Sequence, residues 1–163
     1  TIGIIGFGRI GGNVLKYAKS FGAKILIYDP FIKGNYKNTL SKIKNNSDII
    51  LSSMSYSKKN WNFFNWNFFK TLKQKPIFIN TSRGEVVNEV DLIKALKLNK
   101  VSFAAVDVIK NEQLIMKKKN ILVEYSKENH NLIVTPHIAG LTFESEKIAA
   151  NITIKNLINF FSK

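Results

Sequence analysis

Three glycines near the start of the chain have a spacing that favours phosphate binding. Gly6, Gly8 and Gly11 form a G-x-G-x-x-G pattern between an apolar run beginning at Ile2 and a stretch with helical periodicity. In such a turn the first glycine permits a tight bend, the second lets the backbone approach a pyrophosphate, and the third lets helix and strand pack closely. The N-terminus of the following helix offers N–H groups to the phosphates. The pattern therefore predicts a dinucleotide site.

A carboxylate follows the second apolar run. Residues 24–28 have the composition of a strand, and Asp29 comes 18 residues after Gly11. A carboxylate at this place can accept hydrogen bonds from both hydroxyls of an adenosine ribose, and it would repel a 2′-phosphate. The cofactor predicted from these residues is NAD rather than NADP.

Arginine and histidine are scarce, so their positions carry information. Only two of the 25 basic residues are arginine, Arg9 and Arg83, and the two histidines are His130 and His137. Arg83, Glu112 and His137 follow three successive predicted strands. Each could be an ordinary surface residue, but ligands of parallel sheets bind beyond the carboxyl ends of the strands. We therefore expect these three side chains to lie near the cofactor.

Together these three groups suit reversible hydride transfer to a 2-oxo acid. Arg83 can hold the substrate carboxylate with two parallel hydrogen bonds and polarise the adjacent carbonyl. His137 can give the proton that the new alkoxide needs and take it back in the reverse direction. Glu112, bonded to the other ring nitrogen, would fix the tautomer and favour the imidazolium. The predicted partner is a small 2-oxo or 2-hydroxy acid.

Two other titratable residues stand apart from this set. Asp107, at the end of the fifth predicted strand, could bond the nicotinamide carboxamide or could be a buried structural carboxylate. His130 lies in a polar stretch with no strand end beside it, which predicts a surface position.

Strands that alternate with helices must position these residues. Apolar runs predict six strands, at 2–5, 24–28, 48–52, 76–80, 102–108 and 132–135. Helices are predicted at 13–21, near 39–44, at 88–98 behind an Asn88 cap, and after a Thr142 cap, with a lysine-rich loop up to about 131. The first helix has Val14, Leu15, Ala18 and Phe21 on its apolar stripe. This alternation predicts an α/β fold, a doubly wound parallel sheet in three layers.

Six aromatic residues fall within the nine positions 61–69. The apolar stripe of a helix here would comprise Trp61, Phe64, Phe68 and Leu72, which predicts core packing. Phe63 and Trp66 lie off that stripe. They are either partly buried under a loop or form a contact surface for another domain or subunit.

Composition bounds the class of protein. A chain of 163 residues with 45% hydrophobic content is predicted to form one globular domain, 1–163. Cysteine is absent, which excludes a disulfide framework and a cysteine-based metal site, and fits a cytoplasmic location. No apolar run has the length of a membrane span, so we expect no membrane partner.

The net charge of +14 raises the question of a nucleic-acid partner. The lysines are spread along the whole chain, with only short clusters at 58–59 and 117–119. Charge alone indicates solubility and non-specific attraction rather than a site. A solvated lysine-rich surface is the favoured interpretation, and we predict no nucleic-acid partner.

At these residues the chain resembles the D-isomer-specific 2-hydroxyacid dehydrogenases, which include phosphoglycerate, glycerate, glyoxylate and D-lactate enzymes. Four stretches carry the resemblance in the family's order: 6–11 (GFGRIG), 79–87 (INTSRGEVV), 105–108 (AVDV) and 135–140 (TPHIAG). The resemblance covers essentially the whole chain. It implies the Rossmann fold, NAD-dependent oxidoreductase activity and assembly as a homodimer.

The resemblance also implies roles for individual residues. Arg83 is similar to the family's substrate-binding arginine, His137 to its acid/base and Glu112 to the partner of that histidine. The implied cofactor-binding set comprises Gly6, Gly8, Arg9, Ile10, Gly11, Asp29, Ser53, Thr81, Asp107 and Gly140. Within it, Asp29 corresponds to the ribose-binding acid and Asp107 to the aspartate on the nicotinamide side.

The chain departs from the family pattern in three places. Gln113 stands where the family usually has proline, and the loop 53–57 lacks the family's histidine and proline. The family's substrate domain has no counterpart in these residues, so we expect the chain to be the coenzyme-binding domain of a larger enzyme. The alternative is an NAD(H)-binding regulatory or interaction module without turnover, and the intact Arg83, Glu112 and His137 set weighs against it.

Overall fold

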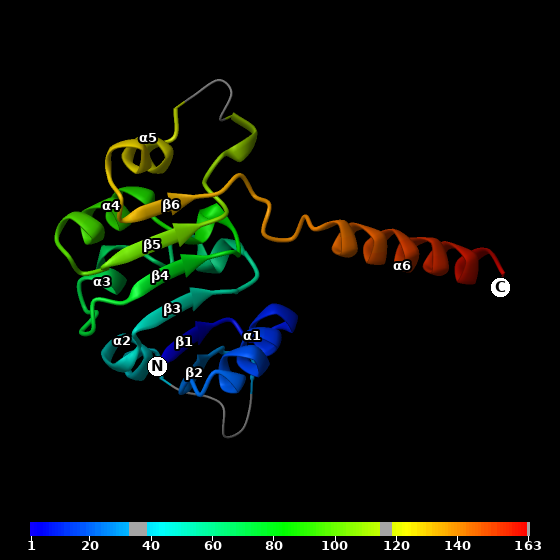
Figure 1. The fold of residues 1–163 in the computed structure, drawn as a ribbon, viewed down its shortest axis with the longest axis horizontal. Coiled ribbons are helices and arrows are strands. Elements are labelled where there is room, and N and C mark those ends of the chain that lie inside the picture. The colour runs from blue at the N-terminus through cyan, green and yellow to red at the C-terminus, as the bar shows by residue number, and fades with distance from the viewer. Residues whose placement is uncertain (33–38, 115–118, 163) are drawn as a thin grey trace.

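The computed structural model describes residues 1–32, 39–114 and 119–162 (Figure 1). These residues contain one six-stranded sheet in the order β2-β1-β3-β4-β5-β6, with every neighbouring pair parallel. The strands are β1 Ile2–Ile5, β2 Ile25–Tyr28, β3 Ile49–Ser52, β4 Ile77–Asn80, β5 Phe103–Val106 and β6 Leu132–Val134. All six predicted strands are therefore confirmed, each shorter than or equal to its predicted range.

Helices connect the strands in the described parts of the chain. They are α1 Arg9–Ser20, α2 Leu40–Asn46, α3 Trp66–Phe69, α4 Glu89–Lys97, α5 Ile121–Glu128 and α6 Phe143–Phe161. Single turns of 3-10 helix occur at Lys58–Asn60, Gly84–Val86 and Glu112–Leu114. The predicted caps Asn88 and Thr142 are confirmed, because each side chain accepts a hydrogen bond from a first-turn N–H group. Thr39 caps α2 in the same way.

Helices cover both faces of the sheet, as a doubly wound fold requires. Alternate residues of a strand point to opposite faces. Leu26, Ile50 and Phe78 point into one apolar cluster, which also holds Ile43 of α2. On the opposite face α1 lies against β1, where a Cβ added at Gly11 would come within 3.2 Å of the Ile4 side chain. The predicted α/β class is confirmed.

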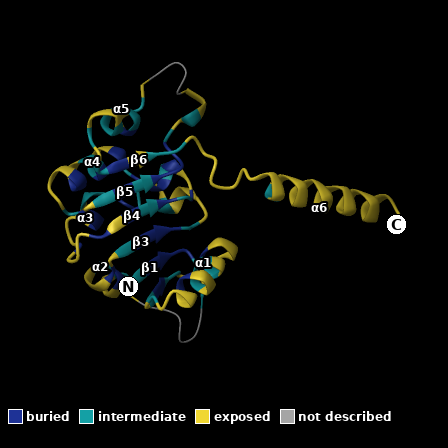
Figure 2. Cartoon of the chain, viewed as in Figure 1, coloured by how far each residue is buried: buried dark blue, intermediate teal, exposed yellow. Residues whose placement is uncertain are grey.

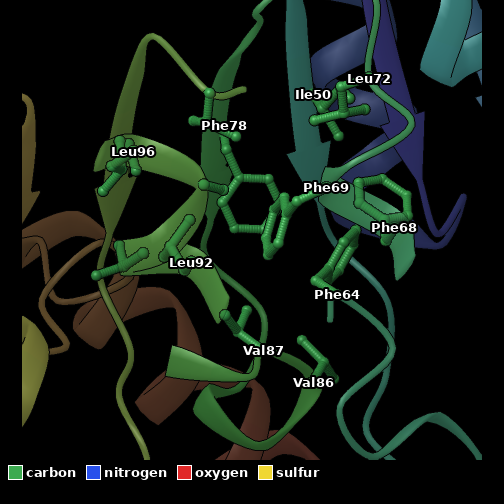
Figure 3. Close-up of a cluster of buried hydrophobic side chains, with 14 of the residues drawn as sticks. Ile50, Phe64, Phe68, Phe69, Leu72, Phe78, Val86, Val87, Leu92 and Leu96 are labelled. Atoms are coloured by element: carbon green, nitrogen blue, oxygen red, sulfur yellow. The ribbon is translucent and has the colours of Figure 1, made fainter. Parts of the chain in front are cut away.

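The aromatic segment does not form the predicted long helix. Only Trp66–Phe69 is helical, while Phe64 makes an isolated parallel bridge to Val87. Phe64, Phe68 and Leu72 are buried as expected, but Trp61 is 58% exposed. Figure 3 shows how the aromatic rings pack beside Phe78 of β4. The bridge to Val87 replaces the helix because it satisfies backbone groups that the packing of Phe64 would otherwise leave buried and unpaired.

The two aromatic side chains off the stripe are partly buried. The ring of Phe63 contacts Phe64, Phe68 and Tyr28. Trp66 lies under the Lys94 ammonium group, 4.2 Å from the ring centroid. These contacts agree with the first of the two interpretations, partial burial within this chain.

Two other expectations about local structure are wrong. Phe21, predicted on the buried stripe of the first helix, is 90% exposed, because α1 ends at Ser20 and Ala18 is its buried apolar residue. The segment up to residue 131 is not all loop, because it contains α5. Asn120 caps α5 by accepting from Leu122 N and Val123 N, and Leu122 is buried against the core. The lysines around this short apolar run hide its helical character in the sequence.

The last helix stands away from the sheet (Figures 1 and 2). Among its described residues none is buried. Large apolar side chains are exposed along it, including Phe143, Ile148, Ile152, Leu157, Phe160 and Phe161. In the part of the chain that the structure describes, no helix is both long enough and apolar enough to cross a membrane.

Candidate active site

The residues that follow the strands lie at one level of the sheet. The register pairs Ile5 with both Tyr28 and Ser52, and continues through Asn80 to Val106 and Val134. The next residue after each of these is Gly6, Asp29, Ser53, Thr81, Asp107 and Thr135. Five of these six belong to the predicted cofactor-binding set, so the parallel register brings that set to one edge.

The glycine turn has the geometry that its spacing predicts. Gly6 has a φ of 95°, and a Cβ there would lie 2.5 Å from the Met54 backbone. A Cβ at Gly11 would lie 2.4 Å from the Gly6 carbonyl oxygen, so strand and helix approach as closely as backbone allows. A Cβ at Gly8 would meet nothing within 4 Å. The turn is closed behind Gly6 and Gly11 and open above Gly8, which leaves room for a ligand.

The start of α1 carries the predicted Arg9 and Ile10, both exposed. Gly8 is the N-cap residue and supplies no side-chain hydrogen bond to the first turn. The first-turn N–H groups and the positive end of the helix dipole therefore face the open space above Gly8. This is the arrangement that binds phosphate at helix N-termini.

A cavity of about 430 Å³ lies beside the glycine turn. Its lining includes Gly6, Phe7, Gly8, Tyr28, Asp29, Ser53, Met54 and Phe63. The Asp29 carboxylate accepts hydrogen bonds from Phe7 N at 2.7 Å and Phe31 N at 2.8 Å. Ser53 Oγ donates to the Gly6 carbonyl oxygen at 2.6 Å. The cavity, the open turn and a carboxylate at its wall fit the adenosine half of NAD.

Glu112 and His137 make the side-chain contact that the sequence predicts. His137 Nδ1 and Glu112 Oε2 are 2.7 Å apart, and Ile109 N donates to Glu112 Oε1 at 3.1 Å. His137 has a φ of 55°, in the left-handed region that costs a non-glycine residue about 1 kcal/mol or more. A second cavity of about 360 Å³ is lined by Asp107, Glu112, Thr135 and His137 among others. The pair therefore borders a space that a small ligand could fill.

Asp107 holds the loop that carries His137. Its buried carboxylate accepts hydrogen bonds from Thr135 Oγ1, from Ile138 N at 2.9 Å and from Ala139 N at 2.9 Å. Burial by itself would raise the pKa of Asp107, but these hydrogen bonds and the nearby His137 outweigh it and hold that pKa below its usual value. Asp107 therefore has the buried structural role that was one of its two predicted roles.

Arg83 lies in the turn after β4 and is exposed. Its Nη1 donates to the Ser82 carbonyl oxygen at 2.7 Å. The following residue, Gly84, touches the segment that carries Glu112, because a Cβ there would lie 2.1 Å from the Ile109 carbonyl group. The structure thus pairs Glu112 with His137 and places the Arg83 turn against the same loop.

A buried polar network that the sequence did not predict lies under this turn. Ser52 Oγ and Ser82 Oγ are 2.9 Å apart, Ser82 Oγ donates to Asn80 Oδ1 at 2.8 Å, and Asn80 Nδ2 donates to the Arg83 carbonyl oxygen at 3.0 Å. All three polar residues are buried. They fix the backbone that presents Arg83. The position of Ser52 and Asn80 at two adjacent strand ends was the sequence feature that could have predicted this network.

The remaining predicted residues lie around the same edge. Thr81 N donates to the Ser52 carbonyl oxygen at 3.4 Å. Gly140 is exposed beyond His137, and its carbonyl oxygen accepts from Ser145 Oγ. His130 is exposed, as expected. The described residues contain no cluster of histidine and carboxylate side chains that could hold a metal ion.

Comparison with known proteins decides the family. Residues 1–139 match the family described as "D-isomer specific 2-hydroxyacid dehydrogenase, NAD binding domain". The chain belongs to this family. The resemblance drawn from the four sequence stretches is confirmed, and so is NAD as the cofactor of the domain.

Similar proteins carry related names. A glyoxylate reductase from Thermococcus gammatolerans is 34% identical over 98% of this chain and 48% of its own length. An erythronate-4-phosphate dehydrogenase from Wigglesworthia glossinidia brevipalpis is 39% identical over the whole chain and 43% of its own length. The chain spans about half the length of the curated relatives it matches.

Solved structures of the family share the fold. A D-lactate dehydrogenase from Aquifex aeolicus, solved with NAD and lactic acid, has a TM-score of 0.87 and 28% identity. The match covers 99% of this chain and 53% of that one. The 2-hydroxyacid dehydrogenase domain seen here is therefore a close structural match to dehydrogenases of the same family that bind NAD.

We predict that glycine substitutions in this domain separate ligand binding from folding. Gly8→Ala should leave the thermal stability nearly unchanged but weaken NADH binding at least about tenfold, because the added methyl group enters the open space. Gly11→Ala should lower the melting temperature, because its methyl group would strike the Gly6 carbonyl oxygen. NADH fluorescence titration and thermal unfolding measure the two effects. Gly12→Ala is the control, since its Cβ also meets nothing within 4 Å; equal binding loss in Gly8→Ala and Gly12→Ala would contradict the assignment.

The Asp107 carboxylate should make stability depend on pH in the acid range. Because its pKa is lowered in the folded state, its stabilising effect is fully present above the unfolded pKa of about 3.9 and is lost as the pH falls through the folded pKa. Urea unfolding at a series of pH values should show a steeper acid loss of unfolding free energy in the wild type than in Asp107→Asn. Glu128→Gln, an exposed change on α5, should behave like the wild type; parallel curves for wild type and Asp107→Asn would refute the prediction.

Proposed function

We propose that the protein carrying this chain transfers a hydride between NAD(H) and a small 2-hydroxy or 2-oxo acid. The observation that carries the proposal is the 2.7 Å hydrogen bond between Glu112 and His137, at the same edge of the sheet as the open glycine turn. A module that only senses NAD has no need of an oriented imidazole at this edge. The family names support the same reading, and nothing in them favours a regulatory module.

The glycine turn and its neighbours are proposed to hold the cofactor. The N–H groups of Gly8, Arg9 and Ile10 would face the phosphates, with Gly6 and Gly11 closing the turn behind them. Asp29 would accept from the adenosine ribose. The further proposed contacts are Ser53, Thr81, Asp107 and Gly140. Bound NAD supplies the hydride acceptor or donor of the reaction.

His137 is the proposed acid and base. Its Nδ1 faces Glu112, so the tautomer with the proton on Nδ1 leaves Nε2 available to the substrate oxygen. In the reduction direction the imidazolium donates its Nε2 proton to that oxygen, and in the oxidation direction neutral Nε2 removes it. Glu112 holds the ring by its Nδ1 atom in either direction.

Arg83 is the proposed anchor of the substrate carboxylate. Within the described residues its guanidinium makes one hydrogen bond, to the Ser82 carbonyl oxygen, which leaves other N–H donors for a carboxylate. The Ser52, Asn80 and Ser82 network holds the turn in place while the side chain stays exposed. A guanidinium suits this role better than an ammonium because it binds carboxylate with two parallel bonds.

We further propose that residues 1–163 are the dinucleotide-binding domain of a longer enzyme, which assembles as a homodimer in the cytoplasm. The span of about half of the relatives' length and the exposed apolar residues of α6 support the first two points. The absence of cysteine suits a reducing compartment.

The dimer can be tested by light scattering coupled to size-exclusion chromatography. We expect a mass twice that of the single polypeptide at micromolar concentration. The single-chain mass over the whole accessible concentration range would contradict a stable homodimer.

Substitutions at the two proposed reacting groups should have different kinetic signatures in the protein that carries this chain. Arg83→Ala should raise KM for the 2-oxo acid and lower kcat/KM about a hundredfold or more, because two charged hydrogen bonds are lost. His137→Ala should lower kcat by roughly 10²- to 10⁴-fold, the usual contribution of general acid–base catalysis. Steady-state assays of NADH oxidation measure both. His130→Ala is the matched control and should be unchanged; normal turnover in His137→Ala would remove His137 from the mechanism.

A further inference from the structure

Glu89 is a buried carboxylate outside the site described above. It is the first residue of α4 and is 9% exposed. Its carboxylate lies in the first turn of this helix. A carboxylate buried this deeply needs hydrogen-bond donors, and those donors show what it holds.

The donors come from two segments beyond β5. Lys110 N donates to Glu89 Oε1 at 2.8 Å. Asn120 Nδ2 lies 3.1 Å from Oε1 and 3.0 Å from Oε2. Asn120 is also the cap of α5, since its Oδ1 accepts from Leu122 N at 2.8 Å. One carboxylate therefore ties α4 to the loop after β5 and to the start of α5.

The loop that Glu89 holds is the loop that carries Glu112. Ile109, next to Lys110, donates its N–H to Glu112 Oε1, and Glu112 Oε2 reaches His137 Nδ1. On its other side the Ile109 and Lys110 backbone touches Gly84, where no Cβ could fit. The backbone at 109–110 is thus held between Gly84 and the Glu89 carboxylate.

We infer that Glu89 is a positioning residue, which sets the Glu112 carboxylate at the distance that selects the His137 tautomer. Its role in catalysis rests on the proposed function, but its effect on the His137 imidazole can be measured without turnover. A shorter acid at this place keeps the charge at the helix N-terminus and loses the reach to Lys110 N. The backbone at 109–110 then moves, and Glu112 moves with it.

The test is the tautomer of His137, read from ¹⁵N chemical shifts of the imidazole ring at a pH where the ring is neutral. In the wild type the Nδ1–H form should dominate. In Glu89→Asp and Glu89→Ala the ratio of Nδ1–H to Nε2–H should fall roughly fivefold, as expected for a weakened hydrogen bond. His130 gives an internal reference in the same spectrum.

Asp91→Ala is the matched control. Asp91 lies in the same first turn of α4, and its carboxylate accepts from Trp66 N at 2.8 Å instead of from the 109–110 loop. Both carboxylates act on the charge of Lys110, as Glu85 does, so the control matches the change in charge. Asp107, the other acid beside His137, is left intact in every variant.

A shift in both Glu89 variants with none in Asp91→Ala supports the inference. Wild-type tautomer ratios in the Glu89 variants overturn it, and so does an equal shift in Asp91→Ala. Should both variants fail to fold, amide hydrogen exchange of the wild type decides, because a rapidly exchanging Lys110 N–H would also overturn it. A tautomer shift without any turnover of 2-oxo acids would leave Glu89 as a positioning residue and remove the proposed function.

Discussion

The structure depends on one geometric constraint, the parallel register of its strands. Parallel pairing aligns the last residues of the six strands, so the chain leaves every strand at the same edge of the sheet. These residues are Ile5, Tyr28, Ser52, Asn80, Val106 and Val134. The groups that follow are therefore neighbours although they are far apart in sequence. At the reversal of strand order between β1 and β3 the two sets of loops diverge and leave room for a ligand.

Loops at this edge are held by buried polar contacts rather than by apolar packing. The Asp107 carboxylate accepts hydrogen bonds from residues before and after His137. Ser52 and Ser82 are hydrogen-bonded to each other beneath the Arg83 turn. Glu89 accepts a hydrogen bond from the backbone of the loop that holds Glu112. Each such group loses its hydrogen bonds to water on burial, and only the native loop position supplies the protein partners that replace them, so displacement of the loop is costly. This explains how the exposed groups that we propose to be catalytic can keep fixed positions on loops.

Much of this arrangement can be predicted from the sequence because it follows from local patterns of apolar residues and glycines. Apolar runs gave the six strands, and the glycine spacing gave a turn whose geometry is confirmed at Gly6 and Gly11. The Glu112–His137 contact was expected because the loops after the adjacent parallel strands β5 and β6 leave the sheet side by side. The sequence did not reveal features that depend on tertiary contacts, namely the bridge between Phe64 and Val87 and the burial of Asn80 and Glu89. It also did not reveal the local cap at Asn120, because lysines surround the short apolar run of α5. Phe21 was misplaced because the helix ends one residue before it.

We propose that the groups at this edge of the sheet catalyse the reduction of a 2-oxo acid by NADH. It is tested most directly by supplying the protein that carries this chain with NADH and a panel of small 2-oxo acids, then determining the configuration of the product by chiral chromatography. We expect NADH oxidation with at least one acid of the panel and a 2-hydroxy acid of D configuration. NADH binding without any oxidation, or a product of L configuration, would contradict it.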